Sequence, residues 1–465
     1  MVRNGQPLRQ AFIFWFCLYS NLTGAEVRSV EAQENSRPYG LASRPNARAY
    51  LRMPESETGQ VPPLLSLTGA FRDVHSVTPN DGLVPYDLNA PFWSDGASKL
   101  RWISVPREAD SPGEKIAFAP TGEWRFPNGT VFVKHFELAT DETKPTLKRR
   151  LETRLLVRDG TGGVYGVTYK WRPDNSDAEL LQTNLSEAIP IKTMAGWRTQ
   201  TWYYPSRADC RTCHTTNAGG VLGVKTRQMN RGFAYPKTGV TDNQLRAWNH
   251  IGLFEPKIDE TAIIGYARLA RTDDRTASLE QRARSYLDAN CSQCHRPGGV
   301  VSYLDARYDT PLAGQNLVDA AVVIDQGIDG ARAIAPNDLW RSIVFMRVNT
   351  LEPLKMPPLA HETLDRDAVE MLREWIRSLP GPPTLDPPAM EPKGGEFKSA
   401  IKVSLKHPEP GVVIRYTLDG SPPGRNATVY AGAIEITGPT TLRAKAFKPG
   451  FNRSITVQET FVVGE

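Results

Sequence analysis

Residues 278–295 read Ser-Leu-Glu-Gln-Arg-Ala-Arg-Ser-Tyr-Leu-Asp-Ala-Asn-Cys-Ser-Gln-Cys-His, and the fold expected for the chain starts from this stretch. Ser278 and Gln281 form a capping-box pattern that is typical of a helix N-terminus. Apolar residues then recur at helical spacing, at Leu279, Ala283, Tyr286 and Leu287. The pattern predicts a helix that leads directly into the motif Cys291-Ser-Gln-Cys294-His295.

The same CxxCH pattern occurs once more, at Cys210-Arg-Thr-Cys213-His214. This is the pattern of covalent haem c attachment. Residues three apart face the same side of one helical turn, so both thiols can reach the vinyl groups of one porphyrin. The histidine that follows can offer a ring nitrogen to the iron. We therefore predict two covalently bound haem c groups, held by Cys210, Cys213, Cys291 and Cys294, with His214 and His295 as iron ligands.

Two other uses of paired cysteines fit less well. A four-cysteine zinc site usually has its pairs about 15–20 residues apart, and Cys213 and Cys291 are much further apart than that. A thioredoxin-like site needs one CxxC within a βαβ pattern, which neither pair shows. Neither use explains a histidine directly after both pairs, so haem is favoured.

The N-terminus predicts export. Arg3 and Arg9 precede the apolar run 11–19, and Thr-Gly-Ala follows at 23–25. This is the pattern of a secretory signal peptide cleaved after Ala25, and the run is shorter than the roughly 20 residues that a membrane-spanning helix needs. Cleavage would remove Cys17 and leave the four motif cysteines of the five in the chain. We expect a periplasmic, secreted or cell-surface protein.

The composition and charge of the chain exclude other classes of protein. The chain has 465 residues, 40% hydrophobic and 23% charged, which indicates several folded domains. Its net charge of +5 arises from 56 basic and 51 acidic residues that are scattered along the chain, so nucleic acid is not an expected partner.

Further helices frame the second motif. One is expected from about Asn337 with an apolar face, and the last carries Ala368 to Leu379 and stops at Pro380. Between them lies Leu354-Lys-Met-Pro-Pro-Leu359. This order resembles a class I cytochrome c domain over about 278–379, and the resemblance implies that Met356 is the distal iron ligand. The alternative for Met356 is packing in an irregular gap.

The distal ligand of the first haem is less clearly indicated. A helix is predicted after a capping box at Thr241 and Gln244, and Met229 lies before this helix, as a distal methionine would in a shortened cytochrome fold. The alternatives are another side chain or an open position. The candidate side chains are His250, His135 and Met194.

Residues 61–205 predict antiparallel β structure. Alternating segments at 130–138, 151–157 and 164–171 are separated by turn residues, which favours a β-sandwich. Within 90–102, Trp93 could stack on the first haem and Lys99 or Arg101 could pair with a propionate. An ordinary turn at Asp95-Gly96 is the favoured interpretation.

Several of these segments together resemble a bacterial family of exported dihaem c-type cytochromes. They are Asn89-Ala-Pro-Phe-Trp-Ser-Asp-Gly-Ala97, Phe126-Pro-Asn-Gly-Thr-Val131, Glu152-Thr-Arg154, the stretch 204–214 and Lys355-Met-Pro-Pro-Leu359. The resemblance covers about 40–380, and it implies haem and export but no substrate.

A Pro/Gly-rich stretch at 379–395 predicts a semi-rigid linker. Beyond it, Tyr-Thr-Leu-Asp-Gly-Ser at 416–421 and Thr-Leu-Arg-Ala-Lys-Ala at 441–446 resemble the C-terminal domain of chitobiases and β-hexosaminidases. In those enzymes this is an accessory domain. The resemblance implies contact with a polysaccharide or cell surface, or a plain spacer.

The predicted protein is therefore multidomain, with an N-terminal antiparallel β-sandwich, two α-helical cytochrome c-like units and a small C-terminal β-sandwich. The boundaries are a signal peptide (1–25), an extended segment (26–60), the β-sandwich-like domain (61–205), the first cytochrome c-like unit (206–275), the second (276–380), a linker (381–395) and the C-terminal domain (396–465).

Electron transfer with redox partner proteins is the expected function. One alternative is a haem enzyme with an open first haem, such as a dihaem peroxidase or a dehydrogenase-associated oxidoreductase. The other is a cytochrome held on a surface or glycan by its C-terminal domain. No catalytic residues are identified by the sequence.

Overall fold

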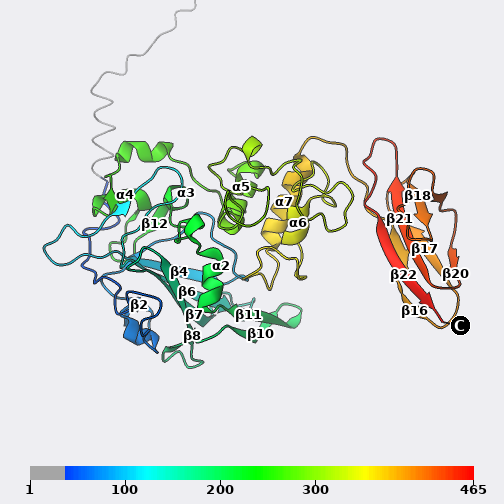
Figure 1. Ribbon diagram of the computed structural model, residues 1–465. Coiled ribbons are helices and arrows are strands. Elements are labelled where there is room, and N and C mark those ends of the chain that lie inside the picture. Colours follow the sequence, from blue (N-terminus) through cyan, green and yellow to red (C-terminus); the bar gives the residue numbers. More distant parts are fainter. Residues whose placement is uncertain (1–36, 465) are drawn as a thin grey trace, which may run out of the picture. The chain divides into compact units, whose positions relative to one another are not determined.

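The computed structural model describes residues 37–464 (Figure 1). The predicted signal peptide, Cys17 and the start of the predicted extended segment lie outside these residues. The chain divides into two units, Met1–Tyr39 and Gly40–Glu465, and every contact described below lies within the second. None of the described helices is long and apolar enough to cross a bilayer.

The N-terminal part is built on one antiparallel sheet of six strands in the order β3-β4-β6-β7-β8-β9. The strands are β3 (Val84–Pro85), β4 (Ser98–Ser104), β6 (Val131–Ala139), β7 (Lys148–Arg158), β8 (Val164–Trp171) and β9 (Ala178–Leu180). The three strands expected at 130–138, 151–157 and 164–171 are thereby confirmed as β6, β7 and β8.

Alternation along the strands gives this sheet two different faces. One face buries Val131 and Val133 of β6 with neighbours from β7 and β8, beneath the segment 51–83. That segment holds η1 (Leu65–Thr68), β1 (Phe71–Asp73) and β2 (Thr78–Pro79). The other face carries Phe132, Lys134 and Arg154, which line a cavity. A hairpin of β10 (Leu185–Thr193) and β11 (Gly196–Tyr204), rather than a full second sheet, packs at the end of this sheet.

The segment 206–275 is not the independent helical unit that the sequence predicted. Its helices are α2 (Arg207–Cys213), α3 (Thr226–Met229) and α4 (Gln244–His250), with short turns η2 (Thr216–Ala218) and η3 (Glu260–Gly265). Its strands are β12 (Gly232–Ala234), β13 (Thr241–Asn243) and β14 (Phe254–Glu255). β14 pairs with β5 (Ile116–Ala117) of the N-terminal part, and Trp248 and Phe254 pack on Trp124. The segment therefore shares its core with the β domain.

The start of α4 also differs from the prediction. Thr241 is not a helix cap, because Thr241–Asn243 is a strand paired with β12. The N-cap is Asn243, whose side chain accepts a hydrogen bond from the backbone N–H of Leu245. Pairing with a neighbouring strand overrides the local capping signal.

Around the second motif, α5 (Leu279–Cys291), α6 (Ile343–Val348) and α7 (Arg366–Ser378) enclose a core of their own, with the turn η4 (Leu312–Gly314) between α5 and α6. Ser278 is confirmed as the N-cap of α5, and α7 ends before Pro380 as predicted. α6 begins at Ile343, later than expected, because Asn337 has a positive φ of 51° and cannot belong to a helix.

The prediction of two α-helical cytochrome c-like units is wrong. The protein is mostly β, with 29% of residues in strands and 15% in helices. The described helices of both segments are short, and long irregular stretches connect them. Local periodicity identified turns of helix correctly, but Gly- and Pro-rich connections limit how far each helix extends.

The C-terminal domain is β. Two sheets, β15-β17-β20 and β16-β22-β21-β18-β19, enclose an apolar core. The strands are β15 (Ala389–Glu391), β16 (Gly395–Phe397), β17 (Ile401–Lys406), β18 (Val413–Thr417), β19 (Thr428–Val429), β20 (Ile434–Ile436), β21 (Thr440–Phe447) and β22 (Val457–Val463). β15 belongs to the predicted linker and pairs with β17.

Candidate functional site

The first CxxCH motif lies on α2 and the turn after it. Ser206 and Asp209 form a reciprocal capping box that starts this helix, and Tyr203 also donates a hydrogen bond to the Asp209 carboxylate. Cys210 and Cys213 are therefore held one turn apart, and His214 is the C-cap. The Ser-x-x-Asp signal is visible in the sequence and could have predicted this helix.

His214 is oriented for metal binding. Its Nδ1–H donates to the carbonyl oxygen of Gly220 at 2.7 Å, which leaves Nε2 as the ring nitrogen with a free lone pair. Burial lowers the pKa of His214 to about 4, despite the opposing effect of the Gly220 hydrogen bond. The imidazole is thus neutral at physiological pH, the form in which histidine binds metals.

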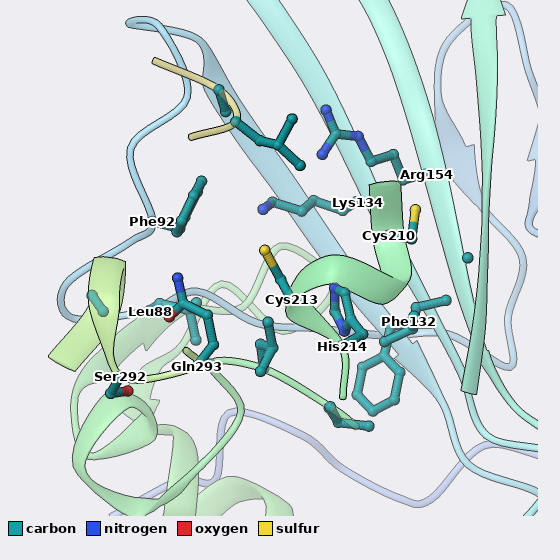
Figure 2. A pocket seen from close by; sticks show the side chains of 18 of the residues that line it. Leu88, Phe92, Phe132, Lys134, Arg154, Cys210, Cys213, His214, Ser292 and Gln293 are labelled. Atoms are coloured by element: carbon teal, nitrogen blue, oxygen red, sulfur yellow. The ribbon is translucent and has the colours of Figure 1, made fainter. Parts of the chain in front are cut away.

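A large cavity opens beside this motif (Figure 2). It contains about 1410 Å³ of space that protein atoms do not fill, part of it open to solvent. Cys210, Cys213 and His214 line it, together with side chains of the six-stranded sheet, the segment 221–228 and the second motif region.

Gly166 on β8 lets α2 lie against the sheet. A Cβ at this position would meet Cys210 Sγ at 2.8 Å and Cys210 Cβ at 3.0 Å. Gly166→Ala is therefore expected to push α2 away and to lower the free energy of unfolding by about 1–3 kcal/mol, the usual cost of overpacking. Denaturant unfolding measures this difference.

Gly265→Ala is the matched control for Gly166→Ala. A Cβ at Gly265 meets no atom within 4 Å, and its φ is not positive. We expect a change within about 0.5 kcal/mol for this variant. Equal effects at both glycines would contradict the close approach of α2 to β8.

The second motif continues from α5. Cys291 ends the helix, and the backbone N–H groups of Cys294 and His295 donate to the Cys291 carbonyl oxygen. Burial, and then the charge of Arg347, lower the pKa of His295. Its Nδ1 is buried without a hydrogen-bond partner among the described residues. The neutral ring is again available to a metal.

A second cavity brings the predicted ligands of this site together. It holds about 720 Å³ of space free of protein atoms, part of it open to solvent, and Cys291, His295 and Met356 all line it. The rest of the wall is largely apolar, from Val301, Tyr303, Leu304, Val322, Val323, Ile324, Ile343, Val344 and Val348. Met356 thus faces the same space as His295, although the two are far apart in the sequence.

The loop that carries Met356 is fixed at several points. The Met356 N–H donates to Arg347 O at 2.9 Å, and His361 Nδ1 lies 2.9 Å from Met356 O. Asp95 Oδ1 accepts the backbone N–H groups of Glu362 and Thr363 at 2.7 and 2.8 Å. The Asp95-Gly96 turn predicted from the sequence is present, with positive φ at both residues, and it also anchors this distant loop.

The two motifs are in direct contact. Cys294 Sγ lies 3.9 Å from Thr212 O, and Asn217 Nδ2 donates to Pro297 O at 3.1 Å. The thiols of Cys213 and Cys294 also interact, which raises the pKa of Cys213 and lowers the pKa of Cys294. Nothing in the sequence predicted this contact.

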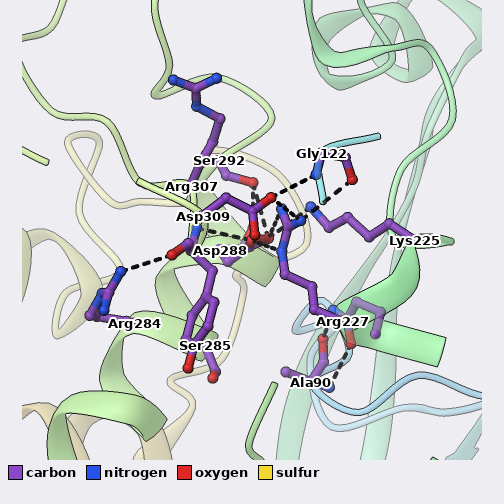
Figure 3. A network of polar contacts seen from close by, with 12 residues as sticks. Ala90, Gly122, Lys225, Arg227, Arg284, Ser285, Asp288, Ser292, Arg307 and Asp309 are labelled. Atoms are coloured by element: carbon purple, nitrogen blue, oxygen red, sulfur yellow. Dashed lines mark hydrogen bonds and ion pairs between the residues drawn. The ribbon is translucent and has the colours of Figure 1, made fainter. Parts of the chain in front are cut away.

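A buried ionic network joins the segments that carry the motifs (Figure 3). Asp288 of α5 accepts Lys225 Nζ at 2.8 Å and Arg227 Nε at 2.8 Å, both from the first segment. Arg227 also pairs with Asp309 at 2.6 Å, and Lys225 with Glu123 at 3.4 Å. The network holds the first segment against the helix that leads into the second motif.

The other predicted residues lie elsewhere. Met229 is fully buried in the aromatic core and does not line the first cavity. His135 faces the opposite side of the sheet, beside Thr153. Met194 is 86% exposed at the tip of the β10–β11 hairpin. His250 ends α4 outside the cavity wall.

Trp93, Lys99 and Arg101 have protein partners. Trp93 Nε1 donates to Thr363 O and Lys99 Nζ donates to Phe92 O. Arg101 pairs with Asp87 at 2.6 Å. Among residues 37–464, no group of three or more His, Cys, Asp or Glu side chains converges as a metal cluster would.

Comparison with known proteins identifies one part of the chain. Residues 392–459 match the chitobiase/beta-hexosaminidase C-terminal domain. No curated protein and no solved structure matches the chain, and nothing found connects it with a cytochrome family.

The chitobiase-type domain offers no flat aromatic surface. In its described residues every aromatic side chain is buried or half-buried. Sugar-binding sites commonly expose aromatic rings that stack on the sugar. Polysaccharide contact therefore remains a prediction from the resemblance alone.

Proposed function

We propose that this protein is an exported dihaem c-type cytochrome that transfers electrons between redox partner proteins. One haem would be attached at Cys210 and Cys213 with His214 as iron ligand, and the other at Cys291 and Cys294 with His295. The observation that carries the proposal is that each motif opens onto its own cavity while the two motifs touch each other.

The residues of each cavity fit a haem. Both histidines are neutral and partly or fully enclosed, with ring nitrogens available to iron. Cys210 and Cys213 line the first cavity and Cys291 lines the second, and the second cavity supplies the apolar surroundings that a porphyrin requires. When bound, haem supplies an iron that takes up or releases one electron.

Met356 supports the assignment of the second site. It faces the cavity of His295 from a loop held by Asp95, Arg347 and His361. A thioether is a weak ligand that must be positioned by the protein, and this loop is positioned at several points. A His/Met pair favours the reduced iron and raises the reduction potential.

The contact between the motifs favours electron transfer over two separate functions. Because Cys213 lies against Cys294, the thioether edges of both haems would be adjacent, and an electron could pass from one to the other within the chain. A haem enzyme would need an open iron and an acid–base residue, and no observation favours that alternative.

The proposal is tested by the haem content of the protein purified from a host that attaches haem c. We expect two covalent haems per chain, visible in the intact mass. Cys210→Ala/Cys213→Ala and Cys291→Ala/Cys294→Ala should each lose one haem, whereas Cys17→Ala should lose none. Absence of covalent haem from the wild-type protein would overturn the proposal.

A further inference from the structure

Charged and amide side chains line the first cavity, and among the described residues all but one of them already have a hydrogen-bond or ion-pair partner. Gln228 bonds to Ala90, and Gln293 bonds to Asn290 O. Lys225 is paired with Asp288. Asp209, Tyr203, Glu123, Arg154 and Arg296 likewise have partners.

Lys134 is the exception. It lies on β6, between Arg101 of β4 and Arg154 of β7 in the strand register. Both neighbours have counter-charges, Asp87 and Glu152 respectively. Among residues 37–464, Lys134 Nζ has no hydrogen bond or ion pair, and it lies over the Phe136 ring, 4.9 Å from the ring centroid.

The side chain extends from the sheet into the cavity, on the side of the helix that carries Cys213 (Figure 2). A cation between two other cations in a sheet is destabilising without a partner. Burial, together with Arg101, Lys99 and Arg154, also lowers the pKa of Lys134 well below its usual value, against the opposing charge of Glu152. Burial and the three neighbouring cations each disfavour the charged ammonium form.

We propose that Lys134 Nζ is the sixth ligand of the iron at the first haem site. The inference rests on the haem function proposed above and replaces Met229, which is fully buried in the core and does not line the cavity. The nitrogen lone pair forms the bond to iron, and the ammonium proton is released to solvent. Binding to iron also removes the positive charge of Lys134 from between Arg101 and Arg154, and so reduces the repulsion among the three side chains.

The test is the spin state of the two irons in the holoprotein, measured by EPR and near-infrared magnetic circular dichroism, with carbon monoxide binding to the reduced protein. In the wild type we expect two low-spin haems and no carbon monoxide bound. Lys134→Ala should give one high-spin haem and one carbon monoxide per chain. Lys134→Arg should do the same, because a guanidinium retains the charge but does not bind iron.

Met229→Leu is the matched control and should leave both irons low-spin. A low-spin first haem in Lys134→Ala, or a high-spin one in the wild type, would overturn the inference. In particular, if Lys134 only paired with a haem propionate, both Lys134 variants would stay low-spin. Two covalent haems in every variant show that the proposed function stands whichever result is obtained, whereas their absence from the wild type would overturn that function instead.

Discussion

Replacing Asp288 by alanine is expected to lower the free energy of unfolding by about 3–5 kcal/mol. The carboxylate is buried and accepts ion pairs from Lys225 and Arg227, whose side chains are 5% and 2% exposed. Its removal leaves both cations in the protein interior without their main counter-charge. Urea unfolding of the wild type and the variant measures the difference.

Two further variants separate charge from packing. Asp288→Asn keeps the shape and most hydrogen-bonding capacity but loses the charge, so its cost should be smaller than that of alanine. Asp319→Ala removes an exposed partner of Arg332 and should change stability by less than about 1 kcal/mol. A cost for Asp288→Ala that is no larger than for Asp319→Ala would show that the network does not hold the segments together.

The same residue predicts an acid sensitivity. Burial raises the pKa of Asp288, but Lys225 and Arg227 lower it further, to about 2. Because an unfolded aspartate titrates near about 3.9, the stabilisation is present at neutral pH and is lost as the pH falls from about 4 through about 2. Asp288→Ala should therefore lose less stability than the wild type over that range.

At the proposed second haem site, replacing Met356 by leucine is expected to have the largest effect of any single substitution outside the motif. If Met356 is the distal ligand, the methionine–iron charge-transfer band should disappear and the reduction potential of that haem should fall. Axial ligands set haem potentials over a span of roughly 0.8 V, so the fall should be a sizeable fraction of it. Absorption spectra and a redox titration measure both effects.

Met346→Leu is the matched control for Met356. Met346 lies on α6 next to the second cavity but does not line it. Its replacement conserves volume and should leave the band and the potential unchanged. Persistence of the band in Met356→Leu would contradict the ligand assignment, and loss of the band in both variants would indicate a general disturbance of the site.

Sequence patterns over a few neighbouring residues correctly predicted the strands and helix ends that depend on those residues alone. Alternation identified β6, β7 and β8, and the Ser278 capping box and Pro380 marked helix ends correctly. The segment 206–275 was predicted wrongly because β14 pairs with a strand from a distant part of the chain. Such pairing leaves no mark in the periodicity of either segment.

The candidate site, too, could be predicted from the sequence only in part. The CxxCH motifs could be identified by spacing alone, and Met356 by the proline-rich loop around it. Lys134 could not, because it looks like one polar residue in an alternating strand until the sheet places it between two arginines. Asp288 was likewise hidden within α5, where a single acidic residue signals nothing about a distant lysine and arginine.

The close fit of α2 on Gly166 and the contact of Cys213 with Cys294 affect how easily the cysteines can be reached in the folded chain. In the folded chain the four thiols are already partly buried against β8, against each other and against neighbouring loops. If the two proposed haems are attached, the sulfurs would be easier to reach before these surfaces close. Attachment would then precede the last steps of folding, and the polypeptide would complete its folding around the bound groups.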